Sequence, residues 1–552
     1  MRLPLSSLFL LTAACAGQTA GDAADDGGGG VSFGGAQDIG EFRGILDRGE
    51  IPGPSTLDAN GFFNEHYAAP PPATCGGKLC ITGGLSVGRA WLDDRHQATL
   101  QIAISTNVDP STYTRLPMRL VVVVDHSGSM AADGRLDKVK HGLNTLIDNL
   151  KPEDRLALIS FDDVVTVNAP FGQTLDRAAL KAEAAKLQPR GGTNIHDGLK
   201  AGLDLLGDAP PSDRQNRVIF LSDGLATVGT TSTPAIIEMA TSRIVRGVGL
   251  TTIGVGDDFD APLMRGLAER GAGNFYYLED AAAAAEVFTD ELDYFMSPLA
   301  LELQLEATAA AGWEMRSAAG TTLWQSTTRT GSMAIPAVFL ASRTSQTPDP
   351  TGGRRGGGSM IFIDLVATGA SPGRVADMKL TYRLPGQTER VTVTASLDYG
   401  SDPTVTPEAP HLSYAGMAER YAMYNMYLGF RAATELAASS SYDCAAAALT
   451  ATRRHGQAWL AEHEADLDLA ADLMLADQFL ANLAARGARA DTSLASCPRV
   501  EPDGFPVDEG WGDDMVVHEP LACSSSRASS GWLAIAAAAV LAGRRRRRTA
   551  RA

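Results

Sequence analysis

Residues 120–130, LVVVVDHSGSM, determine how the central part of the chain is organised. The four consecutive valines at 121–124 predict a strand that is buried on both faces. Asp125, Ser127 and Ser129 follow at the end of that strand, with one residue between each. In open α/β sheets, ligands bind outside the carboxyl ends of the strands. Three hard oxygens at such a position indicate a site for a small hard cation such as Mg²⁺.

The surrounding region, 117–298, alternates between strand and helix patterns. We expect a doubly wound α/β sheet with helices between the strands and one antiparallel edge strand, 164–169. The remaining expected strands are 120–124, 156–161, 218–221, 251–255 and 274–278. The expected helices are 134–150, 176–187, 197–206, 234–245, 261–270 and 281–295.

Two further oxygen ligands are predicted in this region. Thr193 lies in a Gly-Gly-Thr loop just before a helix, and Asp223 follows the strand 218–221 within Ser-Asp-Gly. That strand should neighbour 120–124, which would bring Asp223 close to Asp125. The Asp-x-Ser-x-Ser pattern alone is also compatible with a capped helix turn. The set of five (Asp125, Ser127, Ser129, Thr193 and Asp223) instead indicates a metal site.

DHSGS, GGT and SDG, in this order, resemble the metal-ion-dependent adhesion site (MIDAS) of von Willebrand factor A (VWA) domains. The resemblance implies that the serines and the threonine coordinate the cation directly or nearly so, while the aspartates act mostly through water. It also implies that a carboxylate of a protein partner completes the coordination. Neutral hydroxyl ligands leave the ion electrophilic toward an external acidic group. The ion is expected to be Mg²⁺, with Mn²⁺ or Ca²⁺ as alternatives.

The chain on either side resembles a family of large bacterial VWA proteins of the cell envelope. This wider resemblance depends on EFRGILDRGEIP at 41–52, FFNEHY at 62–67 and MKLTYRLPG at 378–386. We expect a helical segment at 37–78 and a β-sandwich built from 79–116 and 299–405, with the α/β domain inserted in it. The segment 347–358 is expected to be a mobile loop, and 406–490 a helical bundle.

The two ends of the chain indicate export. Residues 1–14 resemble a signal peptide, and Cys15 is a candidate for lipidation, with ordinary signal-peptidase cleavage as the alternative. Residues 15–36 are expected to be a flexible tether and 491–522 an acidic linker. In 523–552, Cys523, the short apolar segment 531–543 and the arginines 544–548 resemble a myxobacterial C-terminal sorting signal. Such tails are cut near the cysteine, and a retained membrane anchor is the alternative.

Export permits disulfide bonds. Cys75 and Cys80 flank a Gly-Gly turn and predict a local bridge, which leaves Cys444 to pair with Cys497. The formal net charge of −18 argues against a nucleic-acid partner.

These observations predict a binding protein at the outer surface of a Gram-negative cell envelope, which uses a divalent cation to bind an acidic group of a protein partner in adhesion or another protein–protein interaction. The alternative is a structural or assembly factor of the envelope in which the metal only stabilises the fold. We do not expect an enzyme, because the sequence contains no HExxH motif and no general base is identifiable beside the metal ligands.

Overall fold

The computed structural model describes residues 29–500, apart from 110–114, 208–212, 245–247, 257–258, 279–286, 289–297, 342, 344, 348–353, 369–372, 401–404 and 490–491. Some of the predicted features lie outside these residues. They are the signal peptide 1–14, Cys15, nearly all of the helix 281–295, most of the linker 491–522, and the segment 523–552 with Cys523. Among the residues that are described, no helix is both long and apolar enough to cross a membrane.

The central α/β unit is built on a seven-stranded sheet with the order β2-β10-β9-β8-β5-β6-β7 in the described part of the chain. β5 (Met118–Asp125) lies between β6 (Arg155–Phe161) and β8 (Gln215–Ser222) and pairs parallel with both. β9 (Val248–Val255) and β10 (Asn274–Leu278) extend the sheet in parallel on one side. β7 (Val165–Ala169) is the antiparallel edge strand that the sequence predicted.

The valines of β5 alternate between two apolar layers. Val121 and Val123 belong to the layer under α5 (Ile195–Leu206), α6 (Thr233–Ile244) and α7 (Ala261–Arg270). Val122 and Val124 belong to the layer under α3 (Arg135–Asn149) and α4 (Arg177–Ala185). All four side chains are fully buried, and each contributes about 1.5–3 kcal/mol to stability by leaving water. This two-sided burial fixes the carboxyl end of β5 in place.

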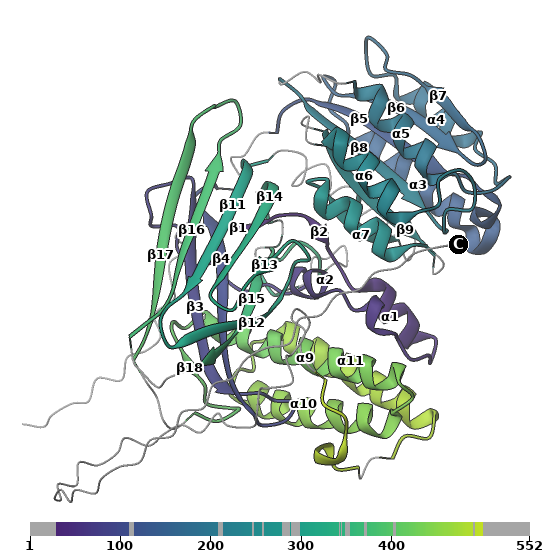
Figure 1. Cartoon of the computed structure of the whole chain (residues 1–552). Helices are drawn as coiled ribbons and strands as arrows, with labels where there is room; N and C mark the ends of the chain where they lie inside the picture. Colours follow the sequence, from purple (N-terminus) through teal and green to yellow (C-terminus); the bar gives the residue numbers. More distant parts are fainter. Residues whose placement is uncertain are drawn as a thin grey trace, which may run out of the picture. The chain divides into compact units, whose positions relative to one another are not determined.

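Strands before and after the α/β unit share a second, eleven-stranded sheet in the described residues (Figure 1). β4 (His96–Thr106) pairs antiparallel with β3 (Leu79–Arg89) and with β15 (Ile361–Ala367), so the α/β unit is inserted in the sequence between strands of this sheet. The remaining strands that follow the α/β unit are β11 (Ala300–Ala309), β12 (Trp313–Ala319), β13 (Gln325–Ser326), β14 (Thr330–Leu340), β16 (Gly373–Arg383), β17 (Arg390–Tyr399) and β18 (His411–Leu412).

The expectation of a flexible tether over 15–36 is wrong for its last eight residues. β1 (Gly29–Ser32) pairs with β4 and β14 of the eleven-stranded sheet, and β2 (Gly35–Ala36) pairs parallel with β10 of the other sheet. We call residues 29–36 the strap. Its order comes from backbone hydrogen bonds, which a sequence rich in glycine does not reveal.

Helices form the rest of the described chain. The N-terminal segment contains α1 (Gly40–Asp47), the 3₁₀ turn η1 (Pro54–Thr56) and α2 (Ala59–Asn64). The bundle contains α9 (Met417–Ala438), α10 (Tyr442–Glu462) and α11 (Leu467–Ala485), which pack against one another (Figure 1), and a short turn η4 (Leu494–Ser496) follows. Phe42 of α1 makes edge contacts with Phe430 and Phe479 of the bundle, at centroid distances of 5.7 and 5.9 Å.

The expectation of a mobile loop at 347–358 is wrong for its last five residues, 354–358. Residues 348–353 lie outside the described chain. Arg355 Nε donates a 2.7 Å hydrogen bond to Asp38, and Arg354 pairs with Asp468 and Asp472 of α11 at 3.3 Å. The residues 356–358 that follow are buried. Charge pairing with distant acidic residues therefore holds a segment whose composition suggests a loop.

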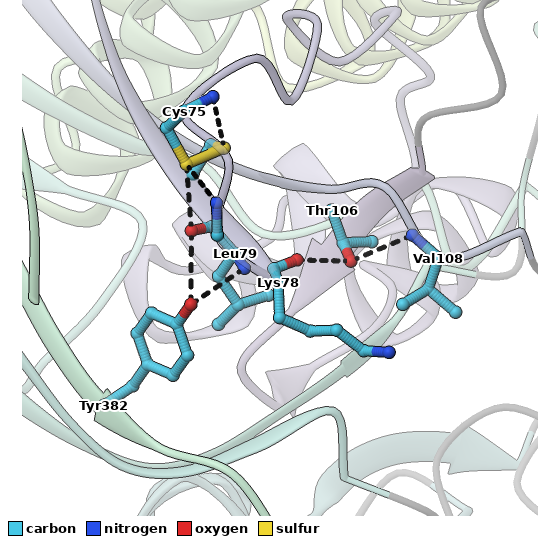
Figure 2. The surroundings of a disulfide bond; sticks show 8 residues. Cys75, Lys78, Leu79, Thr106, Val108 and Tyr382 are labelled. Carbon is cyan, nitrogen blue, oxygen red and sulfur yellow. Dashed lines mark hydrogen bonds between the residues drawn. A yellow bond between two sulfur atoms is a disulfide. The ribbon is translucent and has the colours of Figure 1, made fainter. Parts of the chain in front are cut away.

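The structure contains both predicted disulfides, Cys75–Cys80 and Cys444–Cys497. The first lies at the start of β3, where the Leu79 N–H donates to the Tyr382 hydroxyl of β16 at 3.1 Å (Figure 2). The second closes a loop between residues separated by 53 positions. In the chain-entropy model, such a bridge stabilises the folded protein by about 4 kcal/mol.

Candidate metal centre

The predicted ligands lie where β5 and β8 end, side by side at the carboxyl edge of the seven-stranded sheet. Asp125 is the last residue of β5, and Asp223 follows the last residue of β8; both are fully buried. Asp125 accepts hydrogen bonds from the Ser127 N–H at 2.8 Å and from the Ser222 hydroxyl at 2.6 Å. These bonds hold the start of the loop that carries the two serines.

The hydroxyls of this loop face Asp223. The Ser127 and Ser129 oxygens lie 3.0 Å apart, and the Ser129 hydroxyl donates to Asp223 Oδ1 at 2.8 Å. The loop continues as a 3₁₀ segment, η3 (Gly128–Gly134), into α3. Hydrogen bonds thus link four of the five predicted ligands in one cluster.

Thr193, the fifth predicted ligand, lies near the same cluster. A Cβ placed on Gly224 would lie 3.8 Å from Ser129 Oγ and 3.8 Å from Thr193 Oγ1, so both hydroxyls border the space beside this glycine. The loop of Thr193 is held by backbone bonds. Gly191 O accepts from the Gly128 N–H at 3.1 Å, and Thr193 O accepts from the Thr227 N–H at 2.9 Å. The structure therefore brings Thr193 near Ser129, a member of the hydrogen-bonded cluster.

The electrostatics of the cluster fit a bound cation. Burial raises the pKa of Asp125 to about 6, because the hydrogen bonds from Ser222 and Ser127 only partly offset desolvation and the nearby Asp223 raises it further. A divalent cation would stabilise the ionised form of this carboxyl. The hydroxyls of Ser127, Ser129 and Thr193 and the two carboxylates are hard oxygen donors of the kind that Mg²⁺ binds. Across the described residues, no group of three or more His, Cys, Asp or Glu could hold a metal ion, so the hydroxyls are essential to this assignment.

Sequence reasoning missed two residues of the site. Ser222 holds Asp125, as described above, and its place just before Asp223 is the signal that could have identified it. Arg135 is the other, because its guanidinium Nη1 donates to Asp223 Oδ2 at 3.1 Å and its side chain is only 8% exposed. In the sequence, Arg135 is only a residue near the start of the expected helix 134–150. His126, between Asp125 and Ser127, is buried, and its Nδ1 donates to Gln188 O at 2.9 Å.

Comparison with known proteins agrees with this geometry. Residues 120–225, which contain all five candidate ligands, match the family model of the von Willebrand factor type A domain. The chain therefore contains a VWA domain. The matched residues contain nearly all of β5, all of β6, β7 and β8, and the cluster at the carboxyl ends of β5 and β8.

Relatives share this domain and differ in length. An uncharacterised protein of Synechocystis sp. is 31% identical over 193 residues, which make up 35% of this chain and 44% of the relative. Inter-alpha-trypsin inhibitor heavy chain H2 of Sus scrofa is 27% identical over 220 residues, 37% of this chain and 22% of the relative. The chain thus spans less than half the length of these relatives. A solved structure, a von Willebrand factor type A protein from Catenulispora acidiphila, is 17% identical with a TM-score of 0.48, covering 72% of this chain and 89% of its own.

Proposed function

We propose that the protein is a binding protein whose VWA domain binds an acidic group of a protein partner through a divalent cation. The observation that carries the proposal is the hydroxyl-rich cluster of Ser127, Ser129 and Thr193 beside two buried aspartates. Hydroxyl ligands are neutral, so a cation held there keeps positive charge for an external carboxylate.

We further propose that this binding takes place at the outer surface of a Gram-negative cell envelope. The support is the resemblance of 1–14 to a signal peptide and of 523–552 to a sorting signal. The two disulfides, Cys75–Cys80 and Cys444–Cys497, fit an oxidising compartment.

The test is capture of the full chain on an array of acidic peptides, each matched by a copy with Asn or Gln in place of Asp or Glu. In Mg²⁺ the protein should bind acidic peptides and ignore their amide copies, and EDTA should abolish binding. Asp125→Ala should behave like EDTA treatment. Asp137→Ala removes an aspartate of α3 whose side chain is 85% exposed, and it should bind normally. Binding that EDTA leaves unchanged would contradict the proposal.

A second function, a structural or assembly factor of the envelope with a stabilising metal, is favoured by one observation. Asp125 and Asp223 are both fully buried, so a cation beside them would offset the cost of burying their charges and stabilise the folded protein even without a partner. This alternative predicts that Mg²⁺ raises Tm while carboxylate-dependent capture is absent. The same array, combined with thermal unfolding in Mg²⁺ and in EDTA, separates the two functions.

A further inference from the structure

Two exposed apolar residues lie at the sheet edge that carries the candidate metal centre. Val164 and Leu225 each come three residues after the end of a parallel strand, β6 and β8, and these two strands flank β5. They are 62% and 58% exposed, and they are two of only six large apolar residues that are exposed in the described part of the chain. Single exposed apolar residues are common on protein surfaces, so the position of these two decides their meaning.

Leu225 lies in a loop that is held against the loop of Thr193. It follows Gly224, where an added Cβ would lie 3.8 Å from Thr193 Oγ1. Two and three residues further on, the N–H groups of Thr227 and Val228 both donate to Thr193 O, at 2.9 and 3.2 Å. Because neighbouring Cα atoms are 3.8 Å apart, the Cα of Leu225 lies within about 10 Å of the Thr193 hydroxyl.

Val164 lies at the turn between β6 and β7, on the other side of the same loop. Asp163, the residue before it, accepts a 3.0 Å hydrogen bond from the Gly192 N–H. A Cβ on Gly192 would lie 2.7 Å from Asp163 Oδ1 and 2.8 Å from Val228 Cγ2, so the loops after β6 and β8 meet at this glycine. We call Val164 and Leu225 the apolar rim.

The cation and the apolar rim favour different groups on one partner. A bound cation attracts a carboxylate, whereas an exposed apolar side chain is stabilised when another apolar side chain covers it and excludes water. Asp163 is exposed beside Val164, and its carboxylate would repel a second acidic group of the partner. This surface therefore complements one acidic residue with apolar neighbours better than it complements a run of acidic residues.

We propose that the partner presents its acidic residue in an extended apolar segment, with a leucine-like side chain two positions away that packs on the apolar rim. In an extended segment, residues two positions apart face the same side and lie about 6.6 Å apart. A carboxylate on the cation thus leaves the second side chain within reach of Leu225. This inference rests on the proposed function of the metal centre and adds the class of partner to it.

The experiment measures binding of three fluorescent nonapeptides to the full chain in Mg²⁺. The first has a central Glu in a Gly-Ser background, with leucine two positions away on both sides. The second has serine in place of the leucines, and the third keeps the leucines but has Gln in place of Glu. The wild type should bind the first peptide about ten-fold more tightly than the second, because leucine burial adds to the carboxylate contact. It should not bind the third.

The Val164→Ser/Leu225→Ser double variant tests the rim itself. It should lose the preference for the leucine peptide over the serine peptide. Leu116→Ser is the matched control, because Leu116 is 39% exposed but precedes β5, at the opposite edge of the sheet, and it should keep the full preference. If the double variant does not fold, Val164→Thr/Leu225→Gln gives the same comparison.

Equal binding of the leucine and serine peptides by the wild type overturns the inference but leaves metal-dependent binding of an acidic group intact. An undiminished preference in a folded double variant overturns it as well. A wild type that binds neither acidic peptide in Mg²⁺, or that binds the Gln peptide as tightly as the Glu peptide, contradicts the proposed function itself. The wild-type comparison needs no variant, so it decides the question even if both double variants fail to fold.

Discussion

Buried carboxylates have different partners at different places in this protein. Glu65 is paired with Arg43, and Asp223 with Arg135, whereas Asp125 receives hydrogen bonds from the neutral groups of Ser222 and Ser127. Burial alone raises a carboxyl pKa. At Glu65 burial is outweighed by the combined effect of Arg43, Arg354 and the Ile39 N–H, which lowers the pKa to about 2, while at Asp125 burial prevails and raises the pKa to about 6. A cation bound beside Asp125 would stabilise its ionised form.

The ion pair between Glu65 and Arg43 leads to a prediction for a single substitution. Glu65→Gln should lower the free energy of unfolding at pH 7 by about 3 kcal/mol, because it leaves Arg43 and the Ile39 N–H without their carboxylate. The folded-state pKa is depressed, so this contribution is complete above the unfolded value of 4.5 and is lost as the pH falls through about 2.

Urea unfolding of both proteins between pH 7 and pH 2 measures this difference. Glu50→Gln is the matched control, because Glu50 is 53% exposed and pairs with the exposed Arg48, so its loss should cost under about 0.5 kcal/mol. A difference between wild type and Glu65→Gln that stays constant down to pH 2 would contradict the assigned pairing.

At the scale of elements, the strap is held by its backbone. Gly34 and Gly35 have φ of +82° and +84°, which favours glycine. The Gly35 N–H donates to Gly273 O at 2.9 Å, and Asn60 Nδ2 donates to Gly34 O at 2.7 Å. A Cβ on Gly34 would lie 2.3 Å from Gly273 O, a backbone atom that cannot move cheaply.

Gly34→Ala should therefore destabilise the protein by more than about 3 kcal/mol, since the left-handed backbone and the collision with Gly273 add together. Gly49→Ala tests the backbone contribution alone and should cost about 1 kcal/mol, because Gly49 has φ of +75° and a Cβ added there would meet no atom within 4 Å. Urea unfolding of both variants measures the two costs. Equal losses would show that the strap does not pack against Gly273 as described.

The elements also show what the sequence could and could not predict. The valines of β5 and the helices around them have strong apolar periodicity, so that sheet and its ligand loops were predicted closely. β2 is two residues of Gly and Ala with no side-chain pattern, and β14 contains Pro336 and Gly331, which argue against a strand. Arg135 was missed because its partner Asp223 is 88 positions away in the sequence.

At the scale of the whole molecule, the strap contributes strands to both sheets, through β1 to the eleven-stranded sheet and through β2 to the VWA sheet. The strands before and after the VWA domain also meet, where β4 pairs with β15. The VWA domain is therefore connected to the rest of the chain through β2, at the edge of its sheet, as well as at its two ends. All five candidate ligands come from 125–223, so the candidate metal centre lies within the VWA domain alone.

Asp125, Ser127, Ser129, Thr193 and Asp223 are proposed to bind one divalent cation. Calorimetric titration of Mg²⁺ into the full chain tests it most directly, with a Ser127→Ala/Ser129→Ala double variant and with Thr166→Ala, an exposed hydroxyl of β7, as the control. A single ion should bind to the wild type and to Thr166→Ala, and the affinity should fall at least about ten-fold in the double variant because two direct oxygen ligands are removed. Absence of binding by the wild type, or unchanged affinity in a folded double variant, would contradict it.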